Sequence, residues 1–87
     1  MQIEYSRRFV KTLRRVPRKI QEAFRNRLEI FIEDKFDPIL NNHSLSGGMQ
    51  ECRSINITGD WRAVFEELDN GDVVFFIMLG THSQLYK

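Results

Sequence analysis

The sequence has very few of the residues that build disulfides, metal clusters or nucleotide-binding loops. Its 87 residues include a single cysteine, Cys52. One cysteine excludes an internal disulfide and is typical of a protein from a reducing compartment. No cluster of cysteine and histidine has metal-ligand spacing, and no glycine-rich loop of the kind that cradles phosphates is present. We therefore expect no metal or other cofactor, and we do not expect Cys52 to act as a nucleophile.

Long apolar runs are also missing. No apolar stretch approaches the ~20 residues that cross a bilayer, and residues 1–8 lack the apolar segment of a signal peptide. We therefore expect a cytoplasmic protein with no membrane partner. The chain is 41% apolar and 29% charged, which is typical of a folded globular protein. Its length suffices for one domain, residues 1–87, around a single modest core.

The charged residues are unevenly distributed, although the formal net charge is only +1. Residues 1–35 hold ten lysines and arginines against five acidic residues, whereas residues 36–87 hold three against seven. A basic N-terminal half fits a polyanion such as RNA, or an acidic partner peptide. A solvated helix surface explains the same charges equally well.

Periodicity in residues 1–38 indicates one strand and two helices. Residues 2–5 alternate polar and apolar side chains, as a half-buried strand does, and Ser6 is a typical helix N-cap. Pro17 is expected at the start of the second helix, which should end near residue 34, before Pro38. Two apolar stripes at helical spacing should pack on a sheet: Phe9, Val10, Leu13 and Val16, then Ile20, Ala23, Phe24, Leu28, Phe31 and Ile32.

Residues 39–87 change from a loop-like composition to a period of two. Residues 39–50 are rich in asparagine, serine and glycine, which predicts a loop. Ile55 and Ile57 then alternate with Ser54 and Asn56, as in a strand with one core face. A turn at residues 58–60 leads to a strand over residues 61–68. The Asn-Gly pair in residues 69–72 predicts a hairpin into residues 73–79, which are all apolar.

The uniformly apolar residues 73–79 indicate a central strand that is covered on both faces. Residues 85–86 are candidates for a last short strand. The element order therefore predicts an α+β fold, in which a short N-terminal strand and a helical hairpin pack on an antiparallel sheet of four strands, within a range of three to five.

Three segments carry a family resemblance: Leu40–Gly47, Gly59–Arg62 (Gly-Asp-Trp-Arg) and Gly80–Tyr86 (Gly-Thr-His-Ser-Gln-Leu-Tyr). With them the chain, over essentially its whole length, resembles the RelE superfamily of toxins and its YafQ-like branch. The resemblance implies the RelE-like microbial ribonuclease fold. It also implies a toxin of a type II toxin–antitoxin module that cleaves mRNA in the ribosomal A site without a metal. The implied partners are mRNA, the ribosomal RNA surface and a cognate antitoxin in a hetero-oligomer.

The resemblance also implies a set of site residues. Where YafQ-like toxins carry a histidine four residues before their aspartate, this chain has Asn56. The division of labour between the two histidines of this chain therefore stays open, and Asn56 is a candidate RNA contact. Five residues match positions of the family motif: His43 in the loop, Asp60 and Trp61 in the Asp-Trp pair, His82 near the C-terminus and Tyr86 as the closing aromatic residue.

RNA cleavage without a metal needs a base for the 2′-hydroxyl proton, an acid for the leaving 5′-oxygen and a cation for the developing charge. Histidine suits both proton transfers because its unperturbed pKa of ~6.5 lies near working pH. We predict His82 as the general acid and His43 as the general base, with Asp60 orienting a histidine or serving as the base. The alternatives are a structural capping role for His82 and an exposed loop position for His43.

Two arginines lie outside the expected helices, Arg62 and Arg53, and both are candidates for phosphate contact. For Arg53, a salt bridge to Glu66 or Glu67 on a neighbouring strand is an equal alternative. Aromatic side chains stack on the bases of single-stranded RNA, so Trp61 and Tyr86 are candidate RNA contacts. For Trp61, packing in the core is slightly favoured.

Two other functions compete with RNA cleavage. A protein with the same fold can act by binding alone, as ParE-type toxins do on DNA gyrase. An inactive homologue that only binds its antitoxin is the other possibility, which Asn56 keeps open. The acid–base groups His82, His43 and Asp60 favour the enzyme, because a gyrase-binding module has no evident need for them.

Overall fold

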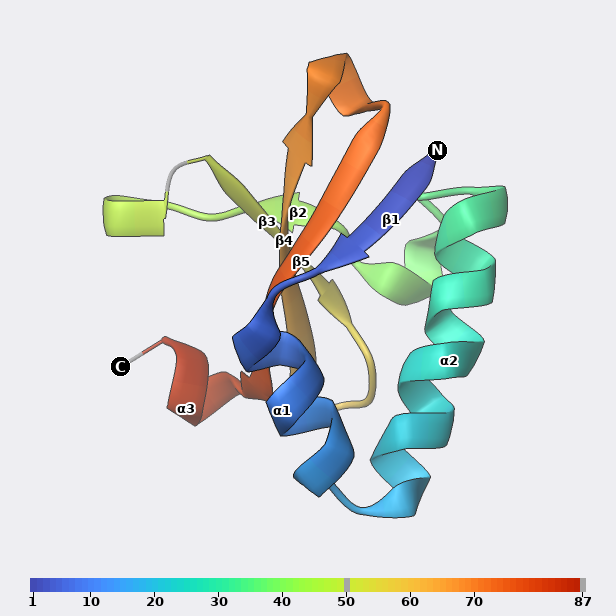
Figure 1. The fold of residues 1–87 in the computed structure, drawn as a ribbon, viewed down its shortest axis with the longest axis vertical. Coiled ribbons are helices and arrows are strands. Elements are labelled where there is room, and N and C mark those ends of the chain that lie inside the picture. The colour runs from blue at the N-terminus through green and yellow to red at the C-terminus, as the bar shows by residue number, and fades with distance from the viewer. Residues whose placement is uncertain (50, 87) are drawn as a thin grey trace.

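The computed structural model describes residues 1–49 and 51–86, so Gln50, at the end of the expected loop, and Lys87 lie outside the described residues. Within the described part the chain forms five strands and three α-helices (Figure 1). Their bounds are β1 Gln2–Tyr5, α1 Arg7–Arg15, α2 Arg18–Glu33, β2 His43–Ser44, β3 Cys52–Asn56, β4 Trp61–Leu68, β5 Val73–Thr81 and α3 His82–Leu85. Short 3₁₀ turns lie at Pro38–Leu40, Gly47–Met49 and Asp69–Gly71.

The strands form one sheet in the order β1-β5-β4-β3-β2. The α+β class is confirmed, and the five strands are one more than the four expected from the sequence and within the range of three to five. The sheet is mixed because β1 runs parallel to β5, with Gln2 opposite Val73 and Tyr5 opposite Phe76. The structure differs here from the expected antiparallel sheet. Alternation of apolar residues identifies the buried face of a strand but not the direction in which it runs.

The helical hairpin forms as the sequence predicts. Ser6 caps α1, since its Oγ accepts a hydrogen bond from the backbone N–H of Phe9 at 2.9 Å. Val16 has an extended backbone because Pro17 follows it, and this separates the two helices. Pro17 is the N-cap of α2, whose last residue, Glu33, lies one position before the expected end.

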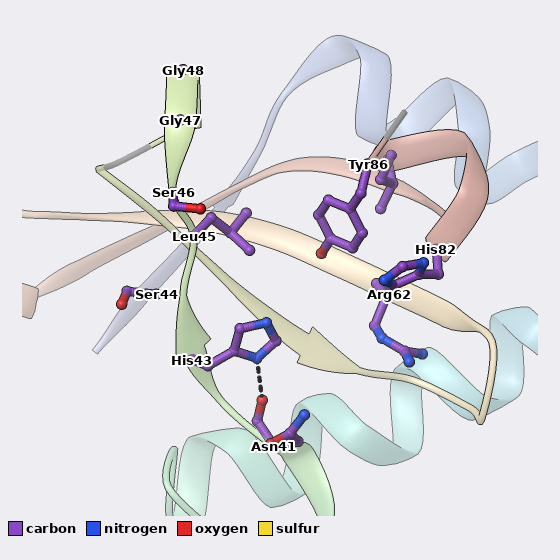
Figure 2. Close-up of a pocket in the computed structure, with 11 residues that line it drawn as sticks. Asn41, His43, Ser44, Leu45, Ser46, Gly47, Gly48, Arg62, His82 and Tyr86 are labelled. Atoms are coloured by element: carbon purple, nitrogen blue, oxygen red, sulfur yellow. Dashed lines mark hydrogen bonds between the residues drawn. The ribbon is translucent and has the colours of Figure 1, made fainter.

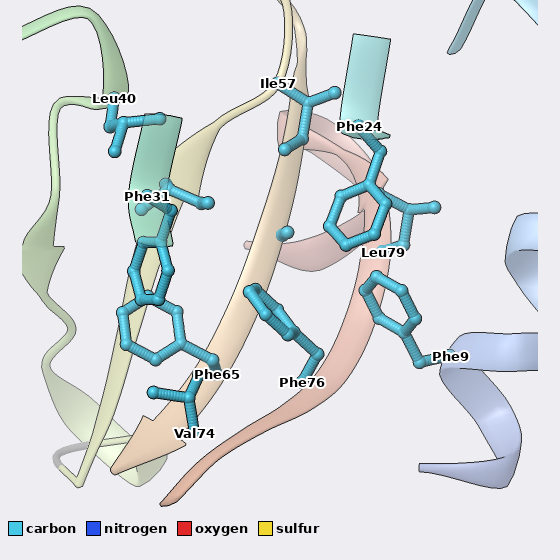
Figure 3. Packing of buried hydrophobic residues seen from close by; sticks show 11 residues of the cluster. Phe9, Phe24, Phe31, Leu40, Ile57, Phe65, Val74, Phe76 and Leu79 are labelled. Carbon is cyan, nitrogen blue, oxygen red and sulfur yellow. The ribbon is translucent and has the colours of Figure 1, made fainter. Parts of the chain in front are cut away.

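The two apolar stripes meet the sheet in one aromatic core (Figure 3) through Phe9, Phe24 and Phe31. Ile32 was expected in the second stripe, but it is 53% exposed, and Ile30 packs against the core instead. Phe76 of β5 lies at its centre and is fully buried. Five aromatic rings have centroids within 5.9 Å of its own: Tyr5, Phe9, Phe24, Phe31 and Phe65. Burial of these side chains is the main force that holds α1 and α2 on the sheet.

The β4–β5 hairpin confirms the Asn-Gly signal. Its loop places Asp69, Asn70 and Gly71 at φ values of 50°, 57° and 91°, a left-handed region that asparagine and glycine tolerate well. β5 is central, as predicted, because it lies between β1 and β4. Its coverage is unequal, however, since Phe75 and Ile77 are only half-buried on the face away from the core.

The segment expected to be a loop contains the edge strand β2. His43 and Ser44 pair with Ser54 and Arg53 of β3 in antiparallel register. A strand of two polar residues at a sheet edge has no alternation that would reveal it in the sequence. The structure thereby fixes His43 on the sheet instead of leaving it on a free loop.

The C-terminal segment is also different from the expectation, because residues 85–86 do not form a strand. Thr81 and Gln84 form a capping box, in which the Thr81 side chain accepts from the Gln84 N–H and the Gln84 side chain accepts from the Thr81 N–H. This box starts the helix α3. A threonine followed three residues later by glutamine is the sequence signal of such a start. Among the described helices, none has the length and apolar composition needed to cross a membrane.

Candidate active site

The two faces of the sheet have different surroundings. Side chains alternate along a strand, so Phe65 of β4 enters the aromatic core while Arg62 and Val64 point to the other face. Directly paired residues share a face. Ser54, which pairs with Val64, and His43, which pairs with Ser54, therefore also point away from the core.

An open pocket of about 680 Å³ lies on this second face (Figure 2). It is bounded by β2 with its adjoining loops, by β4 and by the C-terminal segment. Its lining residues are Asn41, His43, Ser44, Leu45, Ser46, Gly47, Gly48, Arg62, His82, Leu85 and Tyr86. The fold thus brings together four of the residues predicted for the site, namely His43, Arg62, His82 and Tyr86.

His43 enters the pocket from β2 with one ring nitrogen already engaged. Its Nδ1 lies 2.8 Å from the carbonyl oxygen of Asn41. A carbonyl only accepts, so Nδ1 carries the proton, and Nε2 of the neutral ring has a lone pair available. Asn41 has the left-handed conformation, with φ of 47°, that brings its carbonyl to the ring. The exposed His43 is therefore in the tautomer of a base that accepts a proton at Nε2.

His82 reaches the pocket from the start of α3. Its backbone N–H donates to the carbonyl oxygen of Asp60 at 2.9 Å. The His82 ring meets the ring of Tyr86 edge-on, with centroids 4.8 Å apart and planes at 68°. The side chain is exposed, so its imidazole can exchange protons with a bound molecule.

Tyr86 is attached to the sheet by its hydroxyl. The hydroxyl donates a hydrogen bond to Oγ of Ser54 at 2.7 Å. Ser54 is fully buried on β3, whereas the Tyr86 ring is half-buried and lines the pocket. The ring can therefore contact a molecule in the pocket while its hydroxyl stays bonded to Ser54 of the sheet.

Arg62 is fixed at one end of its guanidinium. Its Nη1 donates to the carbonyl oxygens of Thr58, Gly59 and Trp61 at 3.1, 3.0 and 3.2 Å. These bonds hold the side chain on the β3–β4 turn, at the wall of the pocket. Arginine has five N–H donors, so the others remain for an anion such as a phosphate.

Asp60 and Trp61 lie beside the pocket and are not among its lining residues. The Asp60 side chain is exposed, and its contribution to the described site is the backbone carbonyl that accepts from His82. Trp61 packs against the hydrophobic core. This position corresponds to the slightly favoured prediction for Trp61.

Arg53 and Asn56 are not among the residues that line the pocket, although Asn56 lies directly opposite Arg62 in the β3–β4 pairing. Arg53 donates from Nε to the Asn42 side chain at 2.8 Å and lies over the Phe36 ring, on the face of the core. Glu67, an alternative partner for Arg53, is bonded to Lys35 at 2.9 Å. Oδ1 of Asn56 is buried and has no hydrogen-bond partner within the described part of the chain.

Two residues of the site were not singled out from the sequence. Asn41 determines the tautomer of His43, and a sequence signal existed, since asparagine before a turn often adopts the left-handed conformation. Ser54 binds Tyr86 from a segment far away in the chain. No local pattern marks that pairing, because it depends on how α3 lies on the sheet.

The chemistry that the pocket offers is proton transfer beside a fixed cation. Histidine exchanges protons near neutral pH, and guanidinium binds phosphate oxygens. His43, His82 and Arg62 provide these groups around one opening. Among the described residues, no group of three or more histidine, cysteine, aspartate or glutamate side chains is placed to hold a metal ion.

Comparison with known families decides the relationship of the chain. A family model described as "Bacterial toxin of type II toxin-antitoxin system, YafQ" matches residues 1–87. The chain belongs to the YafQ family of type II toxins. The resemblance of the sequence to the YafQ-like branch of the RelE superfamily is thereby confirmed. No curated protein sequence matched this YafQ-family toxin.

Solved structures share the fold of the YafQ-family toxin at low sequence identity. YafQ from E. coli strain BL21(DE3) is 19% identical, with a TM-score of 0.81 over 99% of this chain and 98% of that one. The E. coli DinJ-YafQ toxin-antitoxin complex is similar at 20% identity and a TM-score of 0.78, covering 99% and 97%. A YoeB/ParE toxin from Agrobacterium tumefaciens is 18% identical, with a TM-score of 0.78 over 94% and 99%.

Proposed function

We propose that this YafQ-family toxin is an endoribonuclease that cleaves mRNA on the ribosome and thereby stops translation. The observation that carries the proposal is the convergence of His43, His82 and Arg62 on one open pocket, with Nε2 of His43 available to accept a proton. These groups are the base, the acid and the cation that cleavage of a phosphodiester requires.

The reaction begins when Nε2 of His43 takes the proton of an RNA 2′-hydroxyl. The 2′-oxygen attacks the adjacent phosphorus, the bond from phosphorus to the 5′-oxygen breaks, and that oxygen takes a proton from the His82 imidazolium. The products are a 2′,3′-cyclic phosphate and a 5′-hydroxyl, and the two histidines have exchanged their protonation states. Arg62 stabilises the negative charge that develops on the phosphate oxygens.

The remaining groups bind or position. The Tyr86 ring lines the pocket and is suited to stack on a base of single-stranded RNA. Asp60 orients His82 through its backbone carbonyl. The outer face of α1 has a shallow depression formed by Arg7, Arg8, Lys11, Thr12 and Arg15, and its positive charge suits the ribosomal RNA surface.

A cognate antitoxin is the second proposed partner. The similar E. coli structure is a DinJ-YafQ toxin-antitoxin complex, which supports a partner of this kind. On this chain an apolar groove of about 410 Å³ lies between α1 and α2, lined by Tyr5, Val10, Leu13, Arg14, Gln21, Phe24, Arg25 and Leu28. Its apolar floor and two arginines fit an antitoxin segment that combines acidic and apolar residues.

Primer extension on a reporter mRNA tests the nuclease. Wild type and His82→Ala are induced side by side in growing cells, and cleavage products are mapped over minutes. We expect discrete cuts with the wild type and a cleavage rate about 10²- to 10⁴-fold lower in the variant, because general acid catalysis contributes that much. Glu29→Gln, on the exposed side of α2, is the control that should cleave like the wild type.

The outcomes separate the candidate functions. Cuts that persist undiminished in His82→Ala assign the acid role to another residue. A wild type that makes no cuts but induces the SOS response indicates gyrase binding, and the absence of any growth defect indicates an inactive homologue. Either of the last two results refutes the proposed nuclease.

A further inference from the structure

We propose that Ser54 is a positioning residue of this site, whose buried hydroxyl holds His82 in place through Tyr86. The catalytic meaning of this inference rests on the proposed function, whereas the contact itself does not. The sequence of contacts is short: Oγ of Ser54 accepts from the Tyr86 hydroxyl at 2.7 Å, and the Tyr86 ring meets the His82 ring edge-on at 4.8 Å.

Ser54 is unusual for its environment. It is the one polar residue among the buried side chains of the described structure, with no exposed surface. A buried hydroxyl is costly unless it has a hydrogen-bond partner, so its contact with Tyr86 is the expected reason for a serine at this place. Ser54 also lies directly opposite His43 in the pairing of β2 with β3. It therefore connects the strand of one histidine to the segment of the other.

The segment that carries His82 has few other anchors. α3 is only four residues long, and a helix of one turn is not stable without contacts to the rest of the protein. The bond from His82 N–H to the Asp60 carbonyl holds its start, and Leu85 packs beside Gly80. The Tyr86 hydroxyl holds its end. Without that bond, the edge-on contact that orients the exposed His82 ring has no fixed partner.

Full burial also limits what Ser54 can do. A residue with no exposed surface cannot touch RNA in this structure, so a loss of activity in Ser54→Ala must act through the surrounding protein. Tyr86, by contrast, lines the pocket and is placed to touch RNA directly. Ser54→Ala and Tyr86→Phe therefore remove the same hydrogen bond, the first at its buried partner and the second at the partner that lines the pocket.

Proton NMR of the His82 ring tests the contact without RNA. The Tyr86 ring shifts the His82 ring protons by its ring current, so this displacement should be present in the wild type and largely lost in Ser54→Ala and in Tyr86→Phe. Ser83→Ala removes an exposed hydroxyl from the same helix and should leave the His82 signals unchanged.

Single-turnover cleavage of ribosome-bound mRNA tests the consequence. We expect Ser54→Ala and Tyr86→Phe each to slow cleavage about tenfold, because either change removes the one hydrogen bond that fixes the Tyr86 ring against His82, and one hydrogen bond contributes about that much. The double variant should also be about tenfold slower instead of a hundredfold, because both substitutions remove the same bond. The half-saturating RNA concentration of Ser54→Ala should stay within about twofold of the wild type, while Ser83→Ala cleaves normally.

Thermal unfolding checks that each variant is folded, and Tyr86→Phe decides the question if Ser54→Ala does not fold. Unchanged His82 signals in the folded variants overturn the proposal, as do two rate losses that multiply in the double variant. A wild type that does not cleave ribosome-bound mRNA refutes the proposed nuclease alone, because the NMR comparison still decides whether Ser54 positions His82.

Discussion

The two faces of the sheet differ in how their residues are held. On the core face, five aromatic rings surround Phe76, and many weak contacts determine the position of each ring. On the pocket face, single hydrogen bonds hold the important groups: His43 by Asn41, His82 by Asp60 and Tyr86 by Ser54. The core face should therefore govern stability, and the pocket face should govern activity.

Phe76→Ala should have the largest effect on the core face. Removing a fully buried ring at the centre of the cluster leaves a cavity, and such changes cost about 3–5 kcal/mol of the free energy of unfolding. Denaturant unfolding followed by circular dichroism measures this loss. A loss below about 1 kcal/mol would show that the aromatic core does not dominate the stability of the fold.

Arg62→Lys should have a large effect on the cleavage rate and a small effect on the free energy of unfolding. Lysine keeps the charge but cannot both bond the carbonyls of the β3–β4 turn and present a planar fork to phosphate. We expect cleavage about 10²-fold slower, the usual cost of losing one group that stabilises transition-state charge. Stability should change far less than in Phe76→Ala. Equal cleavage rates for wild type and variant would remove Arg62 from the mechanism.

Ser6→Ala tests a polar contact that belongs to the core side. The Ser6 hydroxyl caps α1 and donates to the Ile77 carbonyl of β5 at 2.7 Å, so one side chain ties the helix to the sheet. Loss of an N-cap costs about 1 kcal/mol. Thermal unfolding should show a lower midpoint, while the cleavage rate of the folded protein stays within about twofold. A large drop in cleavage would indicate that the two faces are coupled.

The smallest expected effect concerns the reactivity of the Cys52 thiol. Burial raises the pKa of this thiol, and the carboxylates of Glu66 and Glu51 raise it further. The thiolate is therefore disfavoured in the folded state. The contribution of Cys52 to the free energy of unfolding is fully present at neutral pH and is lost as the pH rises through the raised pKa. Labelling with iodoacetamide at neutral pH should be slower for the folded than for the unfolded protein. Faster labelling of the folded protein would contradict this environment.

Much of the fold could be predicted because its signals are local. The cap at Ser6, the break at Pro17 and the hairpin at Asn70 and Gly71 each follow from the chemistry of one or two residues. The edge strand β2 could not be predicted, because His43 and Ser44 are ordered by pairing with β3 and not by a pattern of their own. Propensity and periodicity are weak guides where a partner strand decides the structure.

Of the residues predicted for the candidate site, some line the pocket and others do not. His43, His82, Arg62 and Tyr86 were identified from residue chemistry and family resemblance, and the fold places all four around one pocket. Asp60 and Trp61 were identified by the same motif, but they lie beside the pocket. Trp61 is the neighbour of Arg62 in β4 and points to the opposite face, because neighbours along a strand point to opposite sides. Asp60 lies in the turn before β4, where its side chain is exposed.

Local signals in the sequence were enough to place β1, α1, α2 and the β3–β5 strands and to identify their apolar faces, because capping, turn preference and hydrophobic periodicity act over a few neighbouring residues. The sequence also defines the set of groups available for chemistry. That His43 and His82 share a pocket, and that the buried Ser54 supports it, follows from contacts between distant segments. These relations depend on the pairing of β2 with β3 and on the hydrogen bond between Tyr86 and Ser54, 32 residues apart in the chain.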